Sequence, residues 1–104
     1  MIYCVLDEYA IDYSLKGDGV ERRYSYCLLR TPCGYTIIEE YRFDFTNSKI
    51  DDPTFEGNIR TSVYSSNFQD EESARKRFSS MQQSRVAGIK ASAENWKEYS
   101  RSRE

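Results

Sequence analysis

The residues of this chain that could do covalent or metal chemistry are three cysteines, two of which flank a proline–glycine turn. Cys27 and Cys33 lie in the stretch YCLLRTPCGY, and Cys4 lies near the start of the chain. Successive cysteines are separated by 22 and 5 residues, so the chain has no Cys-x-x-Cys motif of a redox centre or zinc knuckle. Histidine is absent, which removes Ser-His-Asp and Cys-His catalysis and the usual nitrogen ligand of zinc.

The three cysteines are therefore expected to be free thiols. A disulfide between Cys27 and Cys33 is disfavoured, because residues at different heights on a tight hairpin do not reach the required Cα separation of about 4.4–6.8 Å. We expect Cys4 and Cys27 to be buried neighbours on adjacent strands. Cys33, at the tip of the turn, is expected to be exposed.

The carboxylates and glycines form no pattern typical of a catalytic or ligand site. Asp51 and Asp52 are adjacent in a loop, without the alternating acidic residues and central glycine of a calcium loop. Glu39 and Glu40 are adjacent in a strand and should point to opposite faces. The glycines of the GDG stretch at 17–19 lack the Lys-Ser/Thr of a phosphate-binding loop. The sequence therefore predicts a protein that is not an enzyme and that has no cofactor or metal.

Alternating apolar residues and turn signals predict an antiparallel meander. Strands are expected at 2–15, 22–31 and 35–45, with turns at the glycines 17 and 19 and at Pro32. In the first strand the apolar residues change parity at Asp7-Glu8, which predicts a bulge or bend there. A fourth strand is expected at 59–66, after a long loop at 46–58.

The strand at 35–45 has aromatic residues on one parity: Tyr41, Phe43 and Phe45. Glu39 shares this parity. Because a glutamate among aromatic residues does not suit a buried face, its position predicts either a second bulge or that Glu39 lies near the end of the sheet.

A helix is expected at about 67–84. Asn67 or Asp70 can cap its first turn. Three residues recur at spacings of four and three and give the helix one narrow apolar stripe: Ala74, Phe78 and Met81.

The segment 86–101 has two interpretations, a β-hairpin or a second helix. Val86, Ile89, Ala93 and Trp96 recur at helical spacings, but Gly88 costs a helix about 1 kcal/mol. We favour the hairpin, and expect 101–104 to be a frayed tail. The expected architecture is one α+β domain over residues 1–104: an antiparallel meander of three to five strands packed on one main helix.

Composition places the chain among small acidic proteins rich in tyrosine. It has 104 residues, nine tyrosines and a net charge of −2. The first 58 residues carry 11 acidic and 6 basic side chains, and the last 46 carry 6 and 9. No apolar stretch approaches the length needed to span a bilayer, and the basic region with which a signal peptide starts is missing before Asp7 and Glu8. We therefore expect no signal peptide, no membrane association and a cytoplasmic location, in the protein's own cell or in a host cell.

The acidic half of the chain predicts a protein partner with a basic surface. Carboxylates interleave with tyrosines on the expected strands and loops, as in Asp7, Glu8, Asp12, Asp18 and Glu21. The residues expected to bind the partner are the charges Glu39, Glu40, Asp51, Asp52 and Glu56 and the anchors Tyr9, Tyr13 and Tyr41. In small size, acidity, tyrosine content and lack of a catalytic set, the chain resembles phage-encoded inhibitors of host defence such as anti-CRISPR proteins. The resemblance is to their general profile, and it implies an inhibitor that blocks a nucleic-acid-handling complex.

The alternative function is binding of single-stranded nucleic acid. Such proteins combine basic side chains with aromatic rings on which bases stack. The residues that would do this are Arg75, Lys76, Arg77, Arg85, Tyr24 and Tyr26. A sequence pI of 5.3 argues against strong phosphate binding, so we favour the protein partner. The sequence carries no signal for an oligomeric state.

Overall fold

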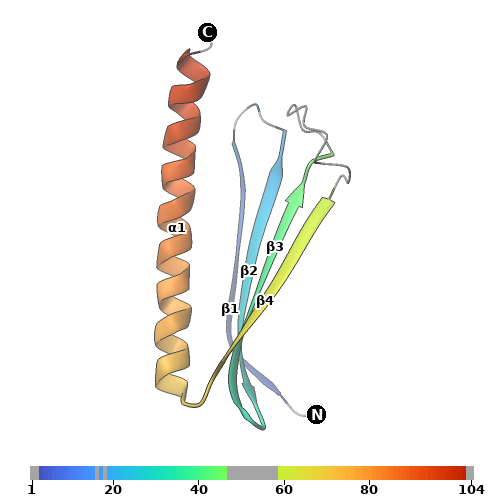
Figure 1. The fold of residues 1–104 in the computed structure, drawn as a ribbon, viewed down its shortest axis with the longest axis vertical. Coiled ribbons are helices and arrows are strands. Elements are labelled where there is room, and N and C mark those ends of the chain that lie inside the picture. Colours follow the sequence, from blue (N-terminus) through green and yellow to red (C-terminus); the bar gives the residue numbers. More distant parts are fainter. Residues whose placement is uncertain (1–2, 16, 18, 47–58, 103–104) are drawn as a thin grey trace.

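The fold is an antiparallel four-stranded sheet with one long helix along one side. A computed structural model describes residues 3–15, 17, 19–46 and 59–102, with side chains described as far as Asn95. The strands are β1 (Cys4–Ser14), β2 (Glu21–Thr31), β3 (Gly34–Asp44) and β4 (Ile59–Phe68), and helix α1 spans Glu71–Ser102. The spatial order of the strands, β1-β2-β3-β4, follows the chain, and Figure 1 shows α1 beside this open sheet. The predicted α+β meander is confirmed.

The register of the sheet contains one irregularity, and it lies in β1. The pairing of β1 with β2 shifts between Val5 and Asp7, where Leu6 is the extra residue. This confirms the predicted bulge near Asp7-Glu8, which lets Leu6 within the bulge and Tyr9 after it both pack against the core. The pairings of β3 with β2 and β4 are continuous. Glu39 therefore lies in the middle of a regular strand, and both explanations predicted for its parity are wrong.

The β2–β3 connection is the tight turn predicted from Pro32 and Gly34. The turn residues are Pro32 and Cys33, and the Cys33 amide donates to Thr31 Oγ1 at 3.3 Å. Gly34 has a φ of +137°, and a Cβ atom there would lie 2.6 Å from the carbonyl oxygen of Phe68. The position therefore requires glycine, both for its backbone conformation and for the close approach of the β4 end.

Helix α1 begins at Glu71 because β4 runs on to Phe68 and Asp70 then caps the helix. Asp70 Oδ2 accepts a hydrogen bond from the Ser73 amide at 2.9 Å, which confirms one of the two predicted caps. This bond to Ser73 lowers the pKa of Asp70.

The favoured C-terminal hairpin is wrong, because α1 continues without a break to Ser102. Gly88 lies on an open part of the helix, with nothing within 4 Å of the place of its missing Cβ. Its cost of about 1 kcal/mol is smaller than the gain from a helix that is already nucleated. Residues 101 and 102 are therefore helical rather than frayed, and 103–104 lie outside the described residues.

The core lies between α1 and the middle of the sheet. Tyr24, Tyr26 and Leu28 of β2 and Ile37 of β3 are buried against the predicted helix stripe of Ala74, Phe78 and Met81. We call this side of the sheet the inner face. It consists of these four strand residues, every second residue from them along β2 and β3, and the residues of β1 and β4 that are paired with those. Within the described part of the chain, no helix is long and apolar enough to cross a membrane.

The cysteines are free and dispersed. Cys33 is exposed, as predicted. Cys4 is also exposed and lies opposite Arg30, whereas Cys27 is half-buried opposite Glu8. The expectation of two buried neighbours is wrong. In the antiparallel register Cys27 lies three residues along β2 from Arg30, the residue opposite Cys4.

Candidate functional site

The tyrosines predicted as partner anchors are packed with one another on the inner face. Tyr9 stacks on Tyr26 with ring centres 4.6 Å apart, and its edge meets Phe78 of α1 at 5.2 Å. Tyr13 stacks on Tyr24 at 5.8 Å. All four tyrosine rings belong to the sheet–helix core or pack against it. Their structural role is therefore evident, and their faces are largely used by neighbouring rings.

Arg85 binds within this aromatic cluster. Its guanidinium carbon lies 4.1 Å from the ring centre of Tyr24 and 4.8 Å from that of Tyr41. Its Nε donates a hydrogen bond of 2.8 Å to the Tyr26 hydroxyl. These are cation–π and charge-assisted contacts, which hold the middle of α1 on the sheet. The structure thus brings Arg85, Tyr24 and Tyr26 together, but as partners of one another rather than as a free stacking surface.

Glu39 is held by Tyr41 on the same strand. The Tyr41 hydroxyl donates to Glu39 Oε2 at 2.5 Å. Burial, and then the bond to this carboxylate, raise the pKa of Tyr41. Both residues line a cavity of about 310 Å³ between sheet and helix, together with Arg77 and Arg85. A carboxylate facing the helix is tolerated here because a hydroxyl and two guanidinium groups border the same space.

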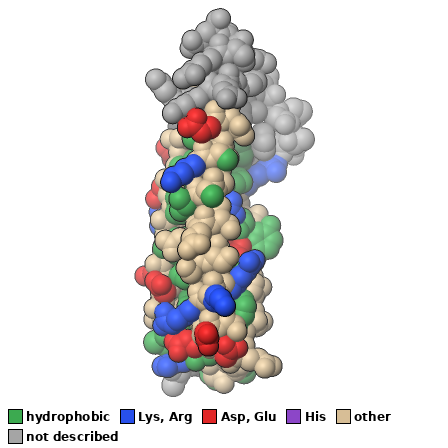
Figure 2. Space-filling model, turned by 90° about the vertical axis from the view of Figure 1, so that its left-hand side faces the viewer, with side chains coloured by type: hydrophobic (Ala, Val, Ile, Leu, Met, Phe, Trp, Pro, Cys, Tyr) green, Lys and Arg blue, Asp and Glu red, His purple; other side chains and the backbone are tan. Residues whose placement is uncertain are grey.

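The basic run at 75–77 lies near the start of the helix and is exposed to solvent. Arg75 is paired with Glu71, with Nη2 3.2 Å from Oε1, and Lys76 and Arg77 are exposed. Figure 2, which faces the helix, shows acidic and basic side chains together at its lower end. Arg75 and Lys76 thus belong to a mixed-charge solvated surface, whereas Arg77 also borders the cavity that Tyr26 and Tyr41 line.

The side of the sheet away from α1 is uncovered, and we call it the open face. It consists of the residues that alternate with the inner face, and every one of them is exposed or half-buried. Its charged members are Glu8, Asp12, Glu21, Glu40, Asp44, Arg23 and Arg42. The described part of the open face thus carries five carboxylates and two guanidinium groups, so it is net acidic.

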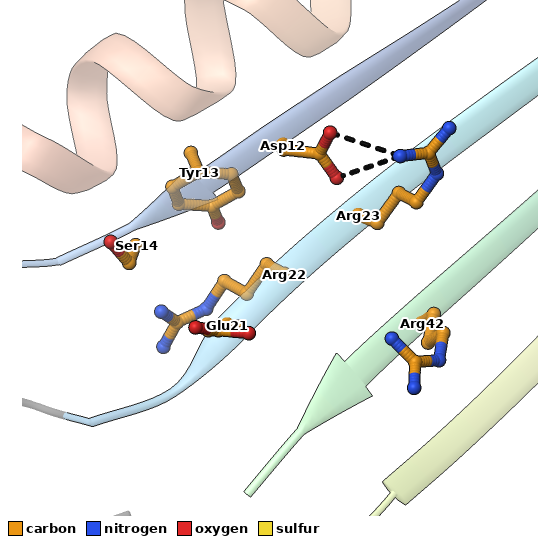
Figure 3. Close-up of a pocket in the computed structure, with 7 residues that line it drawn as sticks. All are labelled: Asp12, Tyr13, Ser14, Glu21, Arg22, Arg23 and Arg42. Carbon is orange, nitrogen blue, oxygen red and sulfur yellow. Dashed lines mark hydrogen bonds and ion pairs between the residues drawn. The ribbon is translucent and has the colours of Figure 1, made fainter. Parts of the chain in front are cut away.

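One end of the open face holds an ion pair. Arg23 Nη1 donates to both oxygens of Asp12, at 3.2 and 3.0 Å, across the β1–β2 pair. Figure 3 shows this bridge, with Arg42 on the neighbouring strand β3. These residues border a hollow of about 430 Å³ that Glu21 also lines. Because Asp12 neutralises Arg23, the charge left at this end comes from Glu21, Asp44 and Arg42.

The centre of the open face is a second hollow, of about 420 Å³, between two glutamates. The small side chains of Ala10 and Ser25 lie beside Glu8 and Glu40, all of which line the hollow with Ile38. Neither glutamate forms an ion pair with another described residue. Arg23 also lines this hollow, but Asp12 neutralises it, so the remaining charge comes from two carboxylates that pair with no described cation. Such a hollow suits an arginine or lysine side chain from a partner.

Of the residues predicted to bind the partner, the open face contains only Glu40. Glu39, Tyr9, Tyr13 and Tyr41 lie on the inner face, and Asp51, Asp52 and Glu56 lie outside the described residues. Sequence reasoning placed Glu8, Asp12, Glu21 and Glu40 in one acidic half of the chain. It did not assign them to one face of the sheet, nor group them with Arg23 and Arg42. Their shared face follows from strand parity once the register is known.

The described residues offer no activated nucleophile. Burial, and then the neighbouring Glu8 carboxylate, raise the pKa of the Cys27 thiol, which disfavours the reactive thiolate. No group of three metal-binding side chains occurs in the described ranges. The net acidic open face suits noncovalent contact with a cationic surface.

Comparison of the chain with protein-family models, with curated proteins and with solved structures finds no match.

Proposed function

We propose that this protein is a noncatalytic protein-binding module that docks a basic partner through the open face of its sheet. The observation that supports this function is that Glu8 and Glu40, on either side of the central hollow, form no ion pair with any residue that the structure describes. A rigid antiparallel sheet holds both carboxylates at fixed positions, so little side-chain ordering is required on binding.

The composition of the open face suits an interface. Half-buried Ile38, Leu29 and Cys27 form an apolar strip, next to exposed Val5 and Val63. Protein interfaces have such an apolar centre with charges at the rim. The net acidic rim accelerates encounter with a cationic surface and repels acidic ones.

The partner class that fits this surface best is a nucleic-acid-handling protein complex. Its phosphate-binding surface is rich in lysine and arginine, and an acidic module that occupies it competes with the nucleic acid. The protein would then act as a stoichiometric inhibitor, in the manner of the phage-encoded anti-CRISPR proteins whose general profile it shares.

The test uses a fluorescein-labelled arginine nonapeptide as the basic probe, titrated by fluorescence anisotropy. We expect binding to the wild-type protein that weakens as salt is added. In the variant Glu8→Gln/Glu40→Gln, two exposed pairs worth about 0.5 kcal/mol each are lost, so the Kd should rise about fivefold. The matched control, Glu72→Gln/Glu94→Gln, removes the same charge from exposed positions on the helix and should bind like the wild type.

Equal affinity of the two double variants would exclude the open face as the binding surface. A labelled oligonucleotide titrated in the same way distinguishes the alternative function. Oligonucleotide binding at low salt, lost in Arg77→Gln, would favour a nucleic acid partner instead.

A further inference from the structure

The two edges of the sheet are unequal. The free edge of β1 is interrupted by the bulge between Val5 and Asp7 and carries the charges of Asp7, Glu8 and Asp12. Bulges and charges are the usual devices that prevent an edge strand from pairing with another chain. β4 has neither device: its pairing with β3 is continuous from Ile59 to Phe68, and its sequence IRTSVYSSNF contains one charge, at Arg60.

β4 is also exposed along most of its length. Val63 is 61% exposed, Tyr64 55% and Ile59 48%, and the two middle residues point to opposite faces. Among the described strands β4 pairs only with β3, so alternate backbone amide and carbonyl groups point away from the sheet. A long, regular and nearly uncharged edge of this kind is a template for another strand.

We propose that β4 pairs with β4 of a second copy of this chain, forming an eight-stranded antiparallel sheet across a two-fold axis. Antiparallel pairing of identical strands requires an axis perpendicular to the sheet, which keeps both open faces on one side. With the axis at Val63 or at Tyr64, Arg60 of one copy lies opposite Ser66 or Phe68 of the other. Like charges are therefore never opposed, and exposed Val63 and Tyr64 gain neighbours.

A second copy fits this edge better than the basic partner proposed for the open face. β4 carries a single positive charge, so it does not attract an arginine-rich strand, whereas another β4 is equally long and nearly neutral. The inference does not depend on the open-face function, because it rests on backbone groups at the edge. Strand pairing alone buries less than a standard interface, so we expect a reversible dimer with a Kd on the order of micromolar.

Sedimentation equilibrium over a range of protein concentrations tests this proposal. The mass should rise with concentration from 12.2 kDa towards twice that value. Val63→Lys and Ser65→Lys each place a charge on β4 beside the axis and should weaken dimerisation at least about tenfold. Ala10→Lys makes the same change at the middle of the β1 edge and should leave the mass as in the wild type.

Circular dichroism establishes that each variant is folded before its mass is compared. A wild-type mass that stays at 12.2 kDa throughout would overturn the proposal. So would a dimer that Ala10→Lys abolishes, or one that both β4 variants leave intact, since these results assign the contact to another surface.

Discussion

Removal of the Arg85 guanidinium should destabilise the fold, although the residue is only half-buried. The side chain makes one hydrogen bond to Tyr26 and lies over the rings of Tyr24 and Tyr41. Arg85→Met keeps an apolar side chain of similar length but removes the hydrogen bond and the charge that lies over the two rings. It therefore isolates what the charge contributes.

The expected loss is about 2 kcal/mol of the free energy of unfolding. A hydrogen bond from a charged donor contributes about 1.5–3 kcal/mol, and each partly exposed cation–π contact about 0.5–1 kcal/mol. Against this, the variant no longer bears the cost of partly desolvating a guanidinium, and methionine retains part of the ring contact. A domain of this length has a total stability of about 5–15 kcal/mol, so the change is large but leaves the protein folded.

Urea unfolding followed by circular dichroism measures the effect, with Arg77→Met as the matched control. Arg77 is exposed on the same helix and makes no hydrogen bond or ion pair with another described residue, so its loss should cost less than about 0.5 kcal/mol. Double-mutant cycles with Tyr26→Phe and with Tyr41→Phe apportion the contacts between the two phenols that interact with the guanidinium. If Arg85→Met were no less stable than Arg77→Met, the aromatic cluster would not anchor the helix.

The remaining predictions concern two glycines and the buried phenols. Gly34→Ala should lower the melting temperature, because the added Cβ would lie 2.6 Å from the Phe68 carbonyl oxygen. Gly88→Ala should instead stabilise the protein by about 1 kcal/mol, because its helix position is open. Equal shifts of the two variants in a thermal melt would contradict this. Burial, and then the hydrogen bond with Tyr24, raise the pKa of Tyr13 from 10.0 to about 12. Because the folded-state pKa lies above the unfolded value, the stability that the neutral phenol contributes is complete below pH 10 and is lost as the pH rises further. Titration followed by tyrosinate absorbance should therefore show phenols that ionise above pH 10 in the folded protein and near pH 10 in urea.

Strand positions were predictable because period-two alternation and turn residues are local signals. The parity change at Asp7-Glu8 indicated the bulge, and Pro32 and Gly34 indicated the tight turn. The assignment of faces was not predictable, because tyrosine suits either a wet face or a packed one. The sequence therefore predicts Tyr9 and Tyr41 as partner anchors, whereas in the structure they pack against the core.

The end of the chain could not be predicted because its local signals conflict. Gly88 penalises a helix, while the spacing of Val86 and Ile89 favours one. The long-range contacts of Arg85, 59 residues from Tyr26 in the chain, hold the middle of α1 on the sheet before Gly88 is reached. No local pattern reports such a contact.

The purely sequential meander has a consequence for how the chain folds during its synthesis. Each strand pairs with the strand made just before it, so the sheet forms from contacts between neighbouring segments of the chain and forms quickly. The helix emerges last, and its Phe78 must then reach back to Tyr9. Until that moment the inner face meets the solvent and other nascent chains. Tyrosines there, in place of leucines, leave hydroxyl groups for water and make this uncovered intermediate less prone to aggregate.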